Sequence, residues 1–108
     1  MRVQITERHC DVPRDIRERA ETQMEALAKF SPRATAAEVV FMEEKVTRVV
    51  EVIVHIDGDP PVIARADDKE FQSALDKVVE RVGRQLREQR SLRTDHQAPP
   101  RRDRAGRG

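Results

Sequence analysis

The fold of this chain is decided in its middle, where residues 46–67 read VTRVVEVIVHIDGDPPVIARAD. Apolar residues recur there at every second position, the period that places side chains on one face of a β-strand. A turn signal at residues 57–60 interrupts the alternation, because glycine tolerates a positive φ and proline fixes its own φ. The stretch therefore predicts two strands that pair antiparallel across a short turn. Their expected inner face comprises Val50, Val52, Val54 and Ile56, then Val62, Ala64 and Ala66.

Two more strands are predicted upstream of this hairpin. Residues 37–42 are strand-like and are joined to the long strand by Glu43-Glu44-Lys45, which is typical of a hairpin connection. Val3 and Ile5 alternate with polar residues at the beginning of the chain, the pattern of a half-buried strand.

A helix is predicted between those two strands. It is expected to begin at Pro13, since proline at the first helical position gives up no needed hydrogen bond. Ser31-Pro32 ends it, because the residue before a proline disfavours helical geometry. Its apolar face is expected to comprise Ile16, Ala20, Met24, Leu27 and Phe30.

A second helix is predicted after Asp67-Asp68, either of which is suited to cap it. Gly83 inside this helix costs about 1 kcal/mol relative to alanine, which indicates close packing or a close approach to a partner. The apolar stripe comprises Phe71, Ala74, Leu75, Val78, Val79, Val82 and Leu86. Cations are expected on the other side, at Lys77, Arg81, Arg84, Arg87 and Arg90.

The predicted order is β-α-β-β-β-α, an α+β domain over residues 1–90. Its four-stranded, mostly antiparallel sheet carries two helices packed on one face, which leaves the other face mostly wet. Residues 91–108 have no periodicity and too few apolar residues to offset their ordering entropy, so they are expected to form a disordered basic tail.

Charge is distributed unevenly along the 108 residues, of which 38% are charged. The net charge of +1 divides into −2 over residues 1–90 and +3 over residues 91–108. A single cysteine allows no internal disulfide, and no apolar run approaches the length of a membrane helix. A small cytoplasmic domain without a membrane anchor is expected.

Residues suited to catalysis or metal binding are scarce. Cys10 follows His9 directly, and adjacent residues of an extended segment point to opposite sides, which disfavours a nucleophile pair. The three histidines are scattered, and the aspartates near the turns lack the spacing of a calcium loop. The sequence therefore predicts no enzyme, no metal, no cofactor and no small-molecule substrate.

Binding to a phosphate backbone is the chemistry that the basic last helix and tail favour, because guanidinium groups can donate two parallel hydrogen bonds to phosphate. An ordinary solvated helix face and a merely solubilising tail remain open as alternatives. The chain has no Tyr or Trp and only three Phe residues, at least two of which are expected in helix cores. Base stacking is therefore disfavoured, and recognition of folded RNA by shape and charge is favoured.

Short motifs in the same order and spacing identify a resemblance that runs from Met1 to about Arg90. They are VQIT at 3–6, IRE at 16–18, EKVT at 44–47, ALD at 74–76 and RQL at 84–86. With them, the chain resembles the ribosome hibernation-promoting factor and ribosome-associated inhibitor family, in its short form without a dimerisation domain. The resemblance implies a fold like that of a double-stranded-RNA-binding domain. It also implies binding to the small ribosomal subunit, with its 16S-type rRNA and ribosomal proteins, at the mRNA/tRNA decoding channel.

The resemblance also implies which residues contact RNA. Relatives carry lysines where this chain has Gln23 and Ala26, and basic residues where it has Glu88. The residues implied to face rRNA phosphates are Lys77, Arg81, Arg84, Gln85, Arg87 and Arg90, with Lys29 and Arg33 as substitutes for the missing lysines. The tail is expected to add charge through Arg93, Arg101, Arg102, Arg104 and Arg107.

The resulting hypothesis is a translation inhibitor that is monomeric when free and blocks idle or stressed ribosomes. The alternative is a protein-interaction module of the same fold that has lost rRNA binding, which the −2 charge of residues 1–90 favours.

Overall fold

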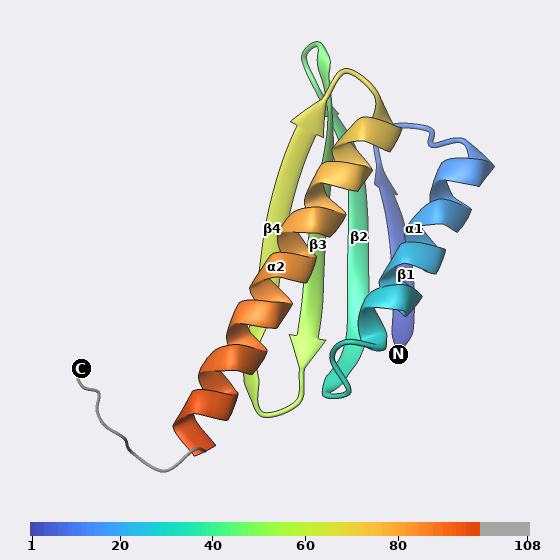
Figure 1. Ribbon diagram of the computed structural model, residues 1–108. Coiled ribbons are helices and arrows are strands. Elements are labelled where there is room, and N and C mark those ends of the chain that lie inside the picture. Colours follow the sequence, from blue (N-terminus) through green and yellow to red (C-terminus); the bar gives the residue numbers. More distant parts are fainter. Residues whose placement is uncertain (98–108) are drawn as a thin grey trace.

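The computed structural model describes residues 1–97, with side chains for residues 1–91, and shows the predicted element order β-α-β-β-β-α (Figure 1). The elements are β1 (Arg2–Arg8), α1 (Arg14–Ala28), β2 (Ala34–Glu44), β3 (Thr47–Ile56), β4 (Asp59–Asp68) and α2 (Phe71–Gln97). No helix in this described part is both long and apolar enough to cross a membrane.

The four strands form one mixed sheet in the order β1-β2-β3-β4. The β2–β3 and β3–β4 pairs are antiparallel, as their short turns require, while β1 lies parallel to β2. Parallel pairing of β1 and β2 needs a crossover connection, and α1 supplies it. Both helices cover the same face of the sheet (Figure 1), as the sequence predicts.

The core lies between that face and the two helices. The alternating residues of β3 that the sequence assigned to the inner face, from Val50 to Ile56, are all buried. Each helix contributes its predicted stripe, with Ile16, Ala20 and Met24 buried on α1 and Leu75, Val78 and Val82 among those buried on α2.

The two turns of the sheet are tighter than the sequence suggests. The β2–β3 connection consists of Lys45 and Val46, and Lys45 takes a positive φ of 54° while Val46 is 83% exposed. The β3–β4 turn uses Gly58 at a φ of 81°, as its glycine predicts, and β4 already begins at Asp59.

Helix ends were predicted less accurately than the strands. Phe30 was assigned to the apolar face of the first helix, but α1 ends at Ala28 and Phe30 is 60% exposed. The second helix was expected to end near Arg90, whereas α2 continues to Gln97, so residues 91–97 are helical instead of the beginning of a tail. The rest of the predicted tail, 98–108, lies outside the described residues.

The sheet face away from the helices is not uniformly wet. Val40, Met42 and Val49 form a second, small buried cluster, and strand alternation places it opposite the main core. Around it, cross-strand partners such as Thr6, Glu51 and Asp67 are polar.

Candidate nucleic-acid interface

The basic residues predicted to share one face of α2 divide between its two flanks. Lys77 and Arg81 turn toward the edge strand β4, whereas Arg90 turns toward α1 and donates to the carbonyl of Phe30. Arg84 and Arg87 remain between these flanks, on the outward surface of the helix. The cations predicted to lie on one side of the helix are therefore distributed over three separate parts of its surface.

On the β4 side, one row of α2 side chains donates hydrogen bonds to the open edge of the sheet. We call this row the edge clamp. Lys77 Nζ donates to Asp67 O at 3.2 Å, Arg81 Nη1 to Arg65 O at 2.5 Å, Gln85 Nε2 to Ile63 O at 3.3 Å and Gln89 Nε2 to Pro60 O at 3.4 Å.

The edge clamp follows from a match between helix and strand repeats. Residues four apart on a helix advance by about 6 Å along its axis. Residues two apart on a strand advance by about 6.7 Å and direct their carbonyls to the same side. Every fourth residue of α2 from Lys77 therefore meets every second carbonyl of β4, read backwards from Asp67 to Ile63.

Lys77 is the one cation of the edge clamp that a carboxylate neutralises. Its Nζ lies 2.8 Å from Asp68 Oδ2, and the hydrogen bond from Lys77, helped by the backbone N–H of Lys69, lowers the pKa of Asp68. Asp68 thus holds Lys77 against the sheet, and neither Asp67 nor Asp68 is the residue directly before α2.

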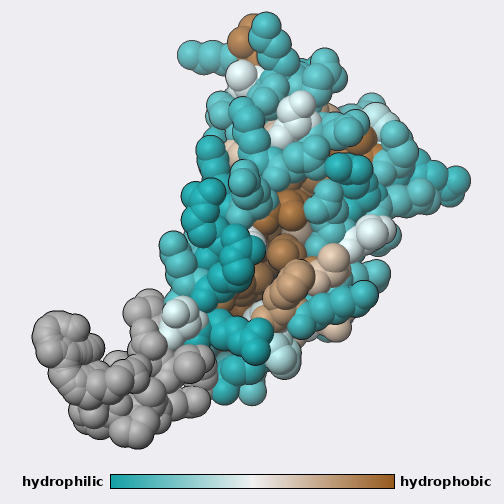
Figure 2. Space-filling model, viewed as in Figure 1, coloured by the Kyte–Doolittle hydropathy of each residue, from teal (hydrophilic) through white to brown (hydrophobic). Residues whose placement is uncertain are grey.

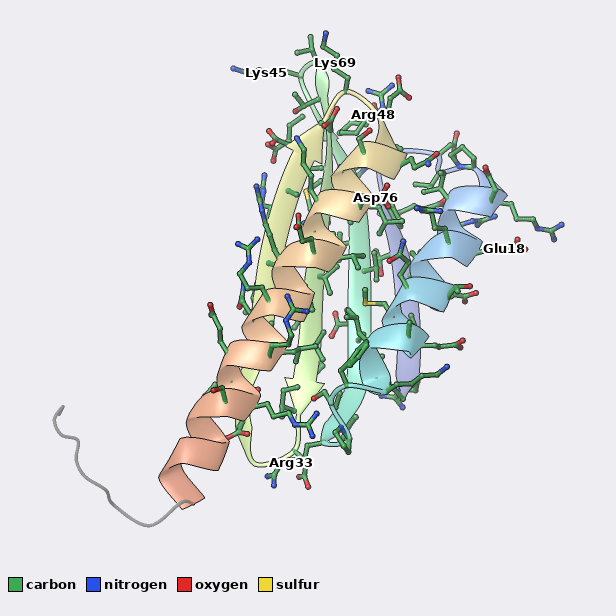
Figure 3. The ribbon with its side chains drawn as sticks, viewed as in Figure 1. Glu18, Arg33, Lys45, Arg48, Lys69 and Asp76 are labelled. Carbon is green, nitrogen blue, oxygen red and sulfur yellow. The ribbon has the colours of Figure 1, made fainter. Side chains whose placement is uncertain are left out.

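The α1 side of α2 is held by one ion pair and one close approach. Arg19 of α1 donates to Asp76 Oδ1 through Nη2 at 3.1 Å and Nε at 3.2 Å, and Figure 3 shows Asp76 between the two helices. A Cβ placed on Gly83 would lie 3.5 Å from Leu27 Cδ2. This is an ordinary van der Waals distance, so close packing within the described residues does not explain the glycine.

Arg84 and Arg87 are the cations that face solvent. Arg84 reaches only Glu80, at 4.0 Å, and its side chain is 59% exposed. Arg87 is exposed, and among the described residues it forms no ion pair. Exposed pairs at such distances contribute little energy, so both guanidinium groups are available to a ligand.

The two predicted substitutes near the end of α1 differ in their surroundings. Lys29 is exposed at the C-cap of α1 and has no ion pair within the described part of the chain. Arg33 donates two hydrogen bonds to Asp57 O, one of them from Nε at 2.9 Å, and lies beside the β3–β4 turn in Figure 3. Arg33 therefore stabilises that turn.

The predicted tail residues are mostly outside the described part. The backbone of Arg93 belongs to α2. Arg101, Arg102, Arg104 and Arg107 lie outside the described residues.

An acidic hollow lies where both helices begin. It is lined by Asp11, Asp15, Glu43 and Glu70, together with Arg48. Arg48 pairs with Glu43 at 3.5 Å and stands over the Phe71 ring at 5.7 Å. Carboxylates at helix N-termini complement the helix dipole. They also give this end of the molecule a negative charge, which is unfavourable for binding a phosphate backbone.

The groups considered for catalysis do not form a site. Cys10 Sγ donates to Phe41 O at 3.4 Å, and burial is the main cause that raises the pKa of its thiol, so the thiol is less reactive. His55 pairs with Glu38 across the exposed sheet face at 3.1 Å. Among the side chains described, those of residues 1–91, no three of His, Cys, Asp or Glu gather as metal ligands would.

Comparison with known families assigns the chain to one of them. The model of the family described as "Sigma 54 modulation protein / S30EA ribosomal protein" matches residues 3–93. The match extends from β1 into α2 and includes every basic position of α2 discussed above. This chain belongs to that family.

Curated relatives match most of this chain at low identity. A "Ribosome hibernation promoting factor" from Azotobacter vinelandii is 28% identical over 86 residues, which cover 80% of this chain and 79% of the relative. A protein of the same name from Escherichia coli K12 is 24% identical over 96 residues, covering 89% of this chain and 100% of the relative.

Solved structures agree with the S30EA assignment at the level of fold. A ribosomal subunit interface protein from Coxiella burnetii superposes with a TM-score of 0.78 at 19% identity, covering 84% of this chain and 99% of that one. The N-terminal domain of Thermus thermophilus Protein Y gives a TM-score of 0.71 at 22% identity, covering 80% and 96%. The implied likeness to double-stranded-RNA-binding domains stays a prediction.

Proposed function

We propose that this protein is a cytoplasmic ribosome hibernation factor that acts by occupancy and catalyses no reaction. The observation that carries the proposal is the S30EA match over residues 3–93, because curated relatives that align with the same residues are named ribosome hibernation promoting factors. Alignment over the whole length of the Escherichia coli relative supports a shared role for the whole domain.

In this proposal, the protein binds the small ribosomal subunit at the mRNA/tRNA decoding channel and blocks translation in idle or stressed cells. The outward surface of α2 makes the main contact, with Arg84 and Arg87 on rRNA phosphates. Arg81 contributes as well, since a guanidinium that gives one N–H to a carbonyl keeps other donors for phosphate.

The electrostatic part of the binding is expected to be weaker than all seven predicted basic residues of α2 and the segment after α1 would give. Lys77 is neutralised by Asp68, and Arg33 is engaged at the β3–β4 turn. Each phosphate contact that is lost lowers the slope of log K against log salt by roughly 0.7 to 0.9. The measured slope of log K against log salt therefore gives the number of phosphate contacts that this chain makes.

Co-sedimentation with purified small subunits over a salt series tests the proposal. Arg84→Glu with Arg87→Glu is expected to abolish co-sedimentation at moderate salt, because two attractive contacts become repulsive. The matched control is Arg14→Glu with Arg17→Glu. It makes the same charge change on exposed residues in the first turn of α1, at the end of that helix away from Lys29. The control is expected to bind nearly as the unaltered protein does.

Equal loss in both variants would show that binding depends on net charge alone and would refute the α2 surface. Competition with tRNA for the subunit tests the channel: occupied subunits are expected to reject tRNA. If tRNA and the protein bind together, the site lies elsewhere on the subunit.

A protein-interaction module is the alternative, and the same salt series separates the two. No binding to subunits even at low salt would favour the module. The exposed guanidinium groups of Arg84 and Arg87, which lie on α2 within the family match, support RNA as the partner.

A further inference from the structure

Phe30 is an aromatic side chain that the fold does not use. It is 60% exposed, and it is absent from the buried residues and from the half-buried ones packed against the core. The other two phenylalanines, Phe41 and Phe71, pack edge to face in the core with ring centroids 5.4 Å apart. Among residues 1–91, whose side chains the structure describes, the ring of Phe30 has no aromatic or cationic partner.

The backbone of Phe30 is nevertheless fixed. Its N–H donates to Leu27 O at 3.0 Å, and its carbonyl accepts from Arg90 Nη1 of α2 at 3.2 Å. The next residue is held in the same way, with Ser31 N donating to Ala28 O at 3.2 Å. The ring is therefore presented to solvent from a rigid position that both helices define.

Three cations lie on this side of the two helices. Lys29 precedes Phe30 in the chain, and Arg90 contacts the backbone of Phe30. Arg87 Nη1 lies 3.4 Å from where a Cβ on Gly83 would be, and that position is 3.5 Å from Leu27 of α1. Figure 2 shows apolar surface in the hollow between the two helices, with hydrophilic side chains on both sides. An apolar protein partner would leave the charges of Lys29 and Arg87 unpaired on binding, whereas a nucleotide offers a ring for the phenyl group and a phosphate for these cations.

We infer that Phe30 stacks on an unpaired base of RNA while Arg87 and Lys29 hold the adjacent phosphates. The inference rests on the proposed function and names one element of its target, a nucleotide outside a duplex. It also reverses the expectation from composition, because an aromatic residue assigned to the core is exposed beside the basic surface.

Substitutions of Phe30 test the inference in the full-length protein with purified small subunits. Phe30→Ala is expected to weaken binding by about 5- to 150-fold, the range that corresponds to the stacking of one base. The salt slope is expected to stay unchanged, because stacking releases no counterions. Phe30→Trp is expected to bind at least as tightly as the unaltered protein, and Phe30→Leu as weakly as Phe30→Ala.

The tryptophan variant supplies a second readout, since the chain has no other Trp or Tyr. A single-stranded RNA oligonucleotide is expected to quench its emission, whereas an RNA duplex of equal length leaves the emission unchanged. The thermal midpoint of Phe30→Ala, expected to match the unaltered protein, checks that the fold is intact.

Unaltered binding by Phe30→Ala would overturn the inference while the proposed function stands. Full binding by Phe30→Leu would also overturn it, because a merely apolar contact with a protein tolerates leucine. If the unaltered protein fails to bind subunits at any salt concentration, the proposed function fails and this inference fails with it.

Discussion

Gly83 lies where α2 passes α1, and its environment leaves room for one methyl group. An added Cβ would meet Leu27 Cδ2 at 3.5 Å and Arg87 Nη1 at 3.4 Å, both ordinary contacts. Gly83→Ala is therefore expected to raise the free energy of unfolding by about 0.5–1 kcal/mol, the gain in helix propensity. Urea unfolding measures this difference.

Gly58 supplies the matched control for the same substitution. Its φ of 81° is unfavourable for alanine, and an added Cβ would collide with Arg33 Nη2. Gly58→Ala is expected to destabilise the protein by more than Gly83→Ala stabilises it. A loss of stability in both variants would show that the helices pack too closely for any side chain at Gly83.

Asp68 gives the protein a predictable response to acid. Its pKa is lowered chiefly by the hydrogen bond from Lys77, so its contribution to stability is present above the unfolded pKa of about 3.9. The contribution is lost as the pH falls through the lower value in the folded protein. The difference in urea midpoint between the unaltered protein and Asp68→Asn is expected to be constant near neutral pH and to shrink below about pH 4.

A Lys77→Met background tests the cause of this response. With its principal partner removed, Asp68→Asn is expected to lose most of its pH-dependent effect. An unchanged effect would assign the lowered pKa to the backbone N–H of Lys69 instead, which lies 2.6 Å from Asp68 Oδ1.

At the scale of elements, the edge clamp protects one side of the sheet. The second and third residues of the edge strand β4 are Pro60 and Pro61, which offer no N–H groups, and α2 side chains bind carbonyls farther along the strand. Unoccupied strand edges invite pairing with another chain. Ile63, at 52% exposure on this strand, would add apolar contact to such a pairing.

Removing the edge clamp is therefore expected to produce association. Lys77→Ala, Arg81→Ala and Gln85→Ala combined should give species larger than a monomer as the concentration rises, measured by light scattering after size exclusion. The combined control Gln72→Ala, Arg84→Ala and Arg87→Ala removes the same charge from exposed residues of α2 without touching β4. Association of the control alone, or of neither variant, would contradict the protective role.

Element ends show what sequence patterns could not decide. Apolar periodicity placed Phe30 on the first helix, but α1 ends at Ala28, before the Ser31-Pro32 signal. For α2 the apolar stripe stops at Leu86, yet no residue from there to Gln97 breaks a helix, and the next prolines are Pro99 and Pro100. In α2, backbone hydrogen bonds therefore continue the helix beyond Leu86, the last residue of its apolar stripe.

At the scale of the whole molecule, the question is whether the arginines after α2 contribute to binding. Residues 98–108 carry four arginines and one aspartate. A chain that ends at Gln97 is expected to bind small subunits more weakly, with a shallower salt slope, if those arginines contact RNA. Ending at Gln97 instead of Arg90 keeps α2 whole, so a loss of binding is not a loss of helix. An unchanged slope would assign these residues to solubility.

The sequence predicted the architecture better than the site. Alternation in β3 and the stripes of both helices fix which faces are buried, because burial of those residues drives folding. The edge clamp escaped prediction since its acceptors are backbone carbonyls, exposed only because β4 is an edge strand. The donors of the edge clamp recur at every fourth residue of the sequence from Lys77 to Gln89, but the sequence does not indicate which acceptors they bind.

The parallel pairing of β1 has a consequence for how the chain is made. Arg2 pairs with Ala36 and Arg8 with Met42, whereas β2, β3 and β4 pair with their immediate neighbours in sequence. During synthesis, β1 therefore has no strand to pair with until α1 and β2 have followed it out of the ribosome.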